Sequence, residues 1–213
     1  RAARSGMSSQ RHRLRVGLFG GTFNPIHLGH LIAAQDAREQ FELDRVLFIP
    51  CALPPHKEAA HLVNAAHRWR MLESCLEGDP HFEASDLELE RGGVSYTIDT
   101  VRVLRERESE CDFFLILGSD SLLELHSWRA VGGLLEAVRV VTLLRPGTPT
   151  PTPEALRLPA PWPERLLADV RVGHQVEISS NDIRRRCAEG LSIRYLVHPA
   201  VEMYIAEHGL YVK

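Results

Sequence analysis

Residues 17–30 read Gly-Leu-Phe-Gly-Gly-Thr-Phe-Asn-Pro-Ile-His-Leu-Gly-His, and this segment constrains the fold more than any other. Its pattern is that of a buried strand, a glycine turn and the start of a helix, and we call it the first corner. Gly20 and Gly21 lack a Cβ and let a ligand approach the backbone. The helix begins with unpaired N–H groups at the positive end of its dipole, which attract anions. The segment therefore predicts a phosphate-binding turn.

His27 and His30 are spaced to share one face of the first helical turn. Each imidazole can donate a hydrogen bond to a phosphate oxygen, and more strongly when it is protonated. Other interpretations stay open, because such junctions also occur in α/β domains without a nucleotide and a His-x-x-His pair can be half of a metal site. No Glu follows His27 as in a zinc-protease helix, and the sequence contains no Cys-x-x-Cys, so we expect no protein-bound metal.

Apolar segments with strand and helix periodicity alternate along the rest of the chain. This alternation predicts an α/β fold, a Rossmann-like doubly wound and mostly parallel sheet with helices on both faces. We expect strands at 15–19, 45–49, 82–90, 112–117, 139–144 and 171–178. We expect helices at 28–41, 64–77, 97–108, 119–137 (broken at Gly132 and Gly133), 180–189 and 199–208.

The length of 213 residues favours one domain, which we place at 14–213 after a flexible segment at 1–13. One hypothesis is that Met7 is the natural first residue and that residues 1–6 were added for expression. Seven of the 13 prolines fall within 145–163, so we expect an irregular surface loop there.

The net charge of −3 argues against broad binding to nucleic acid or membranes, and no apolar run is long enough to span a bilayer. The four scattered cysteines are typical of reduced thiols, so we expect a cytoplasmic protein.

Residues 177–184, which read Glu-Ile-Ser-Ser-Asn-Asp-Ile-Arg, repeat the logic of the first corner, and we call them the second corner. Ser179 or Ser180 can simply cap the following helix. Arg184 lies in the first turn, however, where the helix dipole disfavours a cation. A bound anion at the same helix end would explain it.

A third turn, Gly118-Ser-Asp120, also follows an apolar strand. Gly118 permits close approach of a ligand, and the Asp120 carboxylate can accept ribose hydroxyls. Ser119 or Asp120 can equally be a helix cap. In a doubly wound sheet all three turns lie at the carboxyl edge, where ligands bind.

Both corners resemble signatures of the nucleotidylyltransferase superfamily. The first resembles Gly-Gly-Thr-Phe-Asp-Pro followed by His/Thr-x-Gly-His, and departs from it at Asn24, which cannot act as a carboxylate toward Mg²⁺. The second resembles Ile-Ser-x-Thr-x-Ile-Arg, and departs from it at Asn181.

Three further segments resemble one branch, the bacterial nicotinate mononucleotide adenylyltransferases. They are Pro-Pro-His-Lys ending at Lys57, Ser-Tyr-Thr ending at Thr97, and His-Ser-Trp ending at Trp128. Taken alone, Lys57 is typical of a solvated loop and Trp128 of a core residue. The tail from Ile193 to Tyr211 also matches, so the resemblance spans most of the chain apart from the proline-rich loop.

The resemblance implies transfer of AMP from ATP to nicotinate mononucleotide, with Mg²⁺ bound mainly through the ATP phosphates. It implies a Trp that stacks on the pyridine ring and backbone amides that bind its carboxylate. The implied catalytic residues are His27, His30 and Arg184. The implied ATP-binding residues are Gly20, Gly21, Thr22, Phe23, Gly29, Gly118, Asp120, Ser179 and Ile183, and the implied substrate-binding residues are Lys57, Thr97, Trp128 and Arg129.

Two alternatives remain at this point. One is a related adenylyl- or cytidylyltransferase with another phosphorylated acceptor, such as phosphopantetheine, although His27 and the Trp128 segment disfavour it. The other is a non-catalytic nucleotide-binding module, with Asn24 and Asn181 as signs of decay. A homo-oligomer is a further prediction. The sequence leaves open the choice between nicotinate and nicotinamide mononucleotide.

Overall fold

The computed structural model describes residues 13–54 and 62–212. Six strands form one sheet in the order β3-β2-β1-β4-β5-β6, with every pairing parallel. This doubly wound order reverses direction between β1 and β4, so the predicted Rossmann-like fold is confirmed. The strands are β1 (Leu14–Gly21), β2 (Arg45–Pro50), β3 (Phe82–Ala84), β4 (Cys111–Gly118), β5 (Arg139–Leu144) and β6 (Val170–Val172). The predicted flexible segment 1–13 lies outside the described residues except for Arg13.

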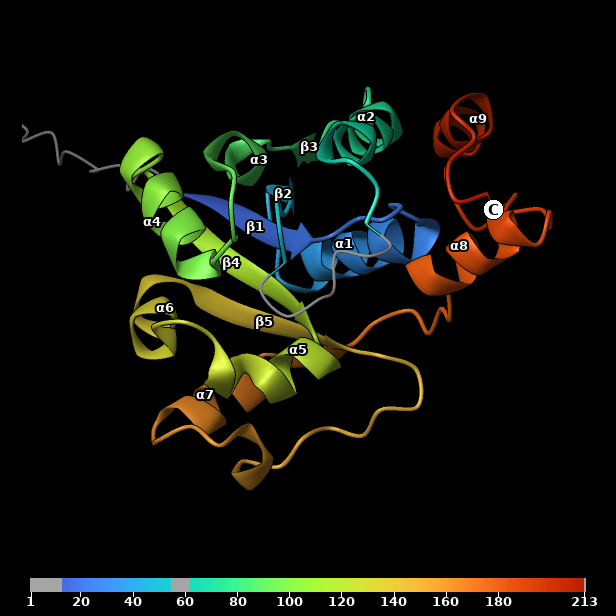
Figure 1. The fold of residues 1–213 in the computed structure, drawn as a ribbon. Helices are drawn as coiled ribbons and strands as arrows, with labels where there is room; N and C mark the ends of the chain where they lie inside the picture. Colours follow the sequence, from blue (N-terminus) through green and yellow to red (C-terminus); the bar gives the residue numbers. More distant parts are fainter. Residues whose placement is uncertain (1–12, 55–61, 213) are drawn as a thin grey trace, which may run out of the picture.

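Helices cover both faces of the sheet (Figure 1). Helices α1, α2, α8 and α9 pack on one face, and α3 to α7 pack on the other. The helices are α1 (Leu28–Gln40), α2 (Ala65–Leu76), α3 (Leu87–Arg91), α4 (Thr97–Arg107), α5 (Ser119–Glu124), α6 (Val131–Ala137), α7 (Trp162–Ala168), α8 (Ser180–Ala188) and α9 (Pro199–Glu207). Two short 3-10 turns are η2 (Leu125–Ser127) and η3 (Glu154–Leu156).

The central strands are apolar on both faces because both are covered. In β4, Phe114 and Ile116 point into the core under α1, whereas Phe113 and Leu115 point into the core under α4. Alternation of side chains along the strand divides one apolar run between two cores. The strand ends, which carry the turns, are thereby held at fixed positions.

The strand predicted at 82–90 is wrong beyond Ala84. Strand β3 ends at Ala84 and pairs with β2, and residues 87–91 form helix α3. The sequence Leu-Glu-Leu-Glu alternates like a strand, but Leu and Glu are also good helix formers. Leu87 is buried at the start of this helix, which packs against β2 on the sheet.

The strand predicted at 171–178 is also too long, because only Val170–Val172 pairs with β5. The backbone N–H of His174 instead donates to Asp36 of α1, 2.6 Å away. A donor used in this way cannot extend the sheet, and the segment turns across α1 toward the second corner.

Two predictions for the sheet face covered by α3 to α7 are wrong in part. The helix 119–137 is broken at Trp128 to Ala130, not at Gly132 and Gly133, which lie within α6. Ala130 has a left-handed φ of 50°, which ends the preceding turn. The proline-rich segment 145–163 is not wholly a solvated loop, because fully buried Leu156 in η3 anchors it in the core.

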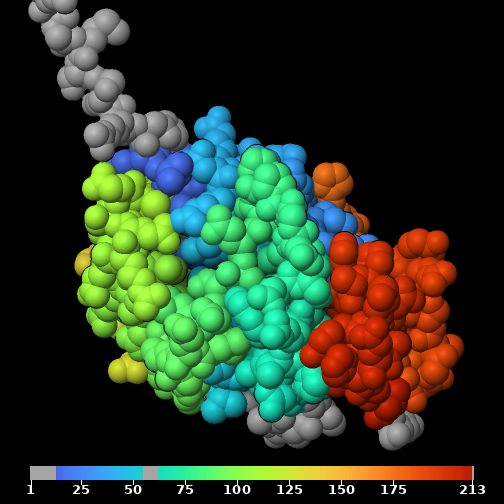
Figure 2. All heavy atoms as spheres, turned by 90° about the horizontal axis from the view of Figure 1, so that it is seen from above, coloured from blue at the N-terminus to red at the C-terminus, as the bar shows by residue number. Residues whose placement is uncertain are grey.

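Helix α9 lies directly against α2, as the red and teal atoms of Figure 2 show. His67 of α2 and the Tyr204 hydroxyl are 3.0 Å apart. Beyond α9, the Tyr211 hydroxyl donates to Asn24 Oδ1 at 2.9 Å, so the end of the chain braces the first corner. In the parts of the chain that the structure describes, every helix is too short or too polar to cross a bilayer.

Candidate active site

A cleft of about 1380 Å³ opens at the carboxyl edge of the sheet and contains both corners. Most of the candidate residues line this cleft. Those that line the cleft are Gly20, Gly21, Thr22, His27, Gly29, His30, Thr97, Gly118, Asp120, Trp128, Arg129, Ser179 and Arg184.

Two candidates lie in the core and do not line the cleft. Phe23 and Ile183 are core side chains that are 1% and 0% exposed, so we expect them to shape the site and not to contact a ligand with their side chains. Lys57 lies outside the described residues. Phe23 has a left-handed φ of 44°, which is strained for a residue with a side chain. Its ring packs edge-to-face against the His30 ring, with 5.1 Å between centroids, and so helps to hold that imidazole in position.

The two imidazoles of the first corner stack on each other, with 3.7 Å between ring centroids and 29° between planes. The backbone N–H of His27 donates to His30 Nδ1 at 3.3 Å. A nitrogen that accepts a hydrogen bond carries no proton, so neutral His30 carries its proton on Nε2. This tautomer makes Nε2 a donor for an anionic oxygen.

His27 is 6% exposed, and its Nδ1 has no hydrogen-bond partner among the described residues. Burial, and then the positive charge of Arg145, lower the pKa of His27 from 6.5 to about 4. His27 is therefore neutral at pH 7 in the unliganded protein. The stronger, charged donor that the sequence suggested requires the negative charge of a ligand nearby.

Gly29 lies between the His27 ring and the carbonyl of Ile178 in the second corner. A Cβ at Gly29 would lie 3.1 Å from His27 Nδ1 and 3.4 Å from the carbonyl oxygen of Ile178. The distance to His27 Nδ1 is tight for a side-chain carbon, whereas the distance to the Ile178 oxygen is an ordinary contact. A glycine at this position therefore leaves room for the His27 ring beside the Ile178 carbonyl of the second corner.

Hydrogen bonds join the corners directly. Arg184 donates from Nη1 to the Asn24 carbonyl at 2.8 Å and from Nη2 to Asn181 Oδ1 at 2.5 Å. The Ser180 hydroxyl donates to the Pro25 carbonyl at 3.0 Å. A guanidinium has five N–H donors, so Arg184 keeps donors for a ligand after these two bonds.

Ser179 is the N-cap of α8, because its hydroxyl accepts the N–H of Asp182 at 3.1 Å. The capping interpretation is thus confirmed for Ser179. The interpretation that Ser119 or Asp120 caps a helix is wrong, because Gly118 is the N-cap of α5. Asp120 instead forms an exposed ion pair of 3.0 Å with Arg145.

Arg145 was not predicted as a site residue. It follows β5 directly and lines the cleft, and a Cβ at Gly118 would lie 3.3 Å from its Nε. The available signal was its position at the end of an apolar strand, which places it at the same edge as the corners. Its charge acts on His27 and adds to the positive potential that a phosphate chain would meet.

Arg68 is a second residue that sequence analysis missed. Its side chain is only 1% exposed and donates to the carbonyls of Thr22, Cys51 and Ala52 at 2.9, 2.7 and 3.1 Å. Burial lowers the pKa of Arg68. The guanidinium thereby links the loop after β1 to the loop after β2 by hydrogen bonds. A single Arg in a helix gives no sequence signal for this role.

Three residues that were predicted to bind the substrate line another part of the cleft, which we call the Trp128 arm. They are Thr97, Trp128 and Arg129. Tyr96 is the N-cap of α4, and Thr97 begins the helix. The Arg129 guanidinium lies over the Tyr96 ring, 4.5 Å from its centroid, and 3.8 Å from Asp99. Half-buried Trp128 presents its remaining surface to the cleft beside them.

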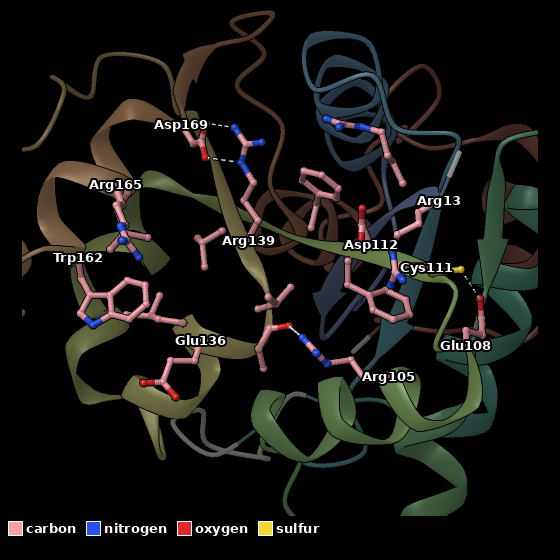
Figure 3. A pocket seen from close by; sticks show the side chains of 18 of the residues that line it. Arg13, Arg105, Glu108, Cys111, Asp112, Glu136, Arg139, Trp162, Arg165 and Asp169 are labelled. Atoms are coloured by element: carbon pink, nitrogen blue, oxygen red, sulfur yellow. Dashed lines mark hydrogen bonds and ion pairs between the residues drawn. The ribbon is translucent and has the colours of Figure 1, made fainter. Parts of the chain in front are cut away.

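A second hollow, of about 800 Å³, lies at the opposite, amino edge of the sheet (Figure 3). Its arginines have structural partners. Arg105 donates to the Ala137 carbonyl at the end of α6, and Arg139 forms two bonds of 2.7 Å with Asp169. Arg13 donates to two backbone carbonyls at 2.8 Å. Helix C-termini leave carbonyls unpaired and carry a negative dipole, which explains cations here.

Comparison with known proteins gives consistent matches. The model of the cytidylyltransferase-like family matches residues 18–186. A Thermomicrobium roseum protein named "Probable nicotinate-nucleotide adenylyltransferase" is 42% identical over 92% of this chain and 91% of its own length. A Thermus thermophilus protein of the same name is 44% identical over 93% of this chain and 100% of its own.

Among solved structures, the fold is similar to that of Plasmodium falciparum nicotinic acid mononucleotide adenylyltransferase complexed with NaAD. The TM-score is 0.73 at 18% identity, over 93% of this chain and 97% of that one. The complex of the same enzyme with APC gives a TM-score of 0.72.

Proposed function

The chain belongs to the nicotinate-nucleotide adenylyltransferases within the cytidylyltransferase-like family, and we propose on this basis how its cleft transfers AMP from ATP to nicotinate mononucleotide. The products are deamido-NAD and pyrophosphate. One structural observation carries the mechanism: both corners line a single cleft and are hydrogen-bonded to each other.

The attacking group is the phosphate of the mononucleotide. Its oxygen forms a bond to the α-phosphorus of ATP while the bond from that phosphorus to the bridging oxygen breaks, and pyrophosphate leaves. The nucleophile is already anionic, so no protein nucleophile is needed. The protein must align the reactants in line and stabilise charge on the phosphate oxygens.

We assign the α- and β-phosphates to His27 and His30. His30 presents a Nε2 donor because its Nδ1 is engaged by the backbone of His27. We assign the β- and γ-phosphates to Arg184 and Ser179 at the start of α8. The Arg184 guanidinium is held by Asn24 and Asn181 and can form charge-assisted bonds with its other donors.

We assign the nicotinate ring to the arm lined by Trp128, Thr97 and Arg129, with stacking on Trp128 and backbone amides toward the carboxylate. The cation–π contact fixes Arg129 on Tyr96 and adds positive charge to this arm. Lys57 is proposed to contact a substrate phosphate as a point charge. Gly118 and Asp120 are proposed to contact the ATP ribose.

Mg²⁺ is proposed to bind through the ATP phosphates and to keep most of its water ligands, as this ion commonly does. The described residues contain no group of three or more His, Cys, Asp or Glu that could hold a metal ion. Asn24 Oδ1 accepts the Tyr211 hydroxyl and lies 3.4 Å from the Val63 N–H, so this oxygen serves the fold. A cytoplasmic location and a homo-oligomeric state remain proposals.

The test is an assay of pyrophosphate release with product analysis. ATP is supplied with nicotinate mononucleotide, nicotinamide mononucleotide or phosphopantetheine in turn, and CTP replaces ATP in a parallel series. We expect efficient formation of deamido-NAD. Arg184→Ala should abolish most of it, whereas His81→Ala, at the end of the sheet away from the cleft, should not. Faster transfer to phosphopantetheine, or nucleotide binding without any turnover, would contradict the assignment.

A further inference from the structure

The cleft continues past the phosphate corner along one face of α1. His30, Ala33 and Asp36 lie on successive turns of this helix, and all three line the cleft. The helix rises 1.5 Å per residue, so Asp36 lies about 9 Å from His30 along the axis. Trp128 and Thr97 line the arm on the other side. If that arm holds the mononucleotide, the base of ATP occupies the arm that ends at Asp36.

A buried carboxylate closes this arm. Asp36 is 5% exposed and accepts two hydrogen bonds from one residue. The backbone N–H of His174 donates to Asp36 Oδ2 at 2.6 Å, and His174 Nδ1 lies 2.6 Å from Oδ1. A Cβ on Gly173 would overlap the same carboxylate, so glycine permits this close approach. The pair fixes the position of the His174 ring.

The other side of that ring is open. The His174 side chain is 76% exposed and lines the cleft together with Asp36. A carboxylate only accepts, so the proton of a neutral His174 lies on Nδ1. Nε2 is then an acceptor on the exposed side of a residue that lines the cleft.

We propose that His174, oriented by Asp36, is a specificity-determining residue that reads the 6-position of the purine. Nε2 accepts a hydrogen bond from the 6-amino group of adenine. A 6-oxo purine presents an acceptor at the same place, which leaves two acceptors facing each other. The inference rests on the proposed function, because it takes ATP as the donor nucleotide.

The test compares kcat/KM for ATP and for inosine triphosphate, which differs in carrying a 6-oxo group, with nicotinate mononucleotide as acceptor. His174→Ala should lower the ATP:ITP preference about fivefold, the contribution of one hydrogen bond between neutral groups. His174→Gln, which restores an acceptor, should recover part of the preference. Gln175→Ala is the matched control, since its exposed side chain bonds only its own segment through the Gly173 carbonyl.

Asp36→Asn tests whether Asp36 sets the hydrogen-bonding state of His174. A residue that only supported the fold would not change the preference for ATP or ITP in the way expected here. The amide oxygen can still accept the His174 backbone N–H, while the amide N–H₂ donates to Nδ1. The ring proton then moves to Nε2, which becomes a donor, and the preference should shift toward ITP beyond the value in His174→Ala. KM for nicotinate mononucleotide should stay unchanged in these variants.

The proposal is overturned if His174→Ala retains turnover and its ATP:ITP ratio stays within twofold of the wild-type ratio. Because His174 is exposed, this variant should fold, which circular dichroism checks independently of the more buried Asp36→Asn. Failure of the proposed function is distinguishable, since in that case the wild-type protein transfers neither nucleotide to the mononucleotide.

Discussion

The buried imidazole of His27 should make the stability of this protein depend on pH in a way that one substitution removes. The pKa of His27 in the folded protein is about 4, against 6.5 when exposed, because burial and Arg145 oppose its charge. Between these values the unfolded chain binds a proton that the folded chain does not. The free energy of unfolding therefore falls as pH is lowered through this window.

The magnitude follows from the two pKa values. At pH 7 both states are almost neutral at His27, and the effect is small. At pH 5 the unfolded imidazole is almost fully protonated while the folded one is not, which costs about 2 kcal/mol of stability. For a domain with a net stability of roughly 5–15 kcal/mol, this loss is readily measured.

The assay is urea unfolding of the wild-type protein and His27→Gln at pH 7, 6 and 5. All other titrating groups are common to both proteins, so the difference between the two curves isolates His27. We expect the wild type to lose about 2 kcal/mol more than the variant between pH 7 and 5. His81→Gln serves as control and should follow the wild type. Parallel curves for wild type and His27→Gln would refute the reasoning.

Three further substitutions test separate parts of the site. His30→Ala removes a positioned donor and should lower kcat about 100-fold or more in the pyrophosphate assay, with little change in the circular dichroism spectrum. An unchanged kcat would exclude a phosphate-binding role for His30. Trp128→Ala should raise KM for nicotinate mononucleotide far more than KM for ATP in steady-state kinetics, and equal effects would contradict stacking. Arg68→Leu removes the donor of three partly buried carbonyls and should lower the free energy of urea unfolding by about 3–5 kcal/mol. A loss below about 1 kcal/mol would show that water replaces the guanidinium.

The sequence predicted the elements that depend on local pattern. The helix expected at 64–77 is α2, which Asn64 caps with its Oδ1 accepting the Ala66 N–H at 2.9 Å. The two corners were found from residue types at fixed spacing, and the parallel sheet brought them together. Errors occurred where a local pattern was compatible with two structures, as in the Leu-Glu alternation before Arg91.

The parts of the site that sequence analysis missed depend on contacts between distant residues. Asp36 and His174 are 138 positions apart, and neither belongs to a recognisable motif. Arg68 reads as an ordinary helix residue until the loops after β1 and β2 surround it. Arg145 gave only a weak signal, its place after a strand. Such pairings follow from the fold and cannot be found from spacing alone.

The central claim is that the two corners hold one triphosphate between them. The most direct test is a crystal structure of the protein with Mg²⁺ and an ATP analogue whose α–β bridge cannot be cleaved. We expect phosphate oxygens within hydrogen-bond distance of His30 Nε2 on one side and of the Arg184 guanidinium on the other. A phosphate chain bound at one corner only, or outside the cleft, would contradict the account.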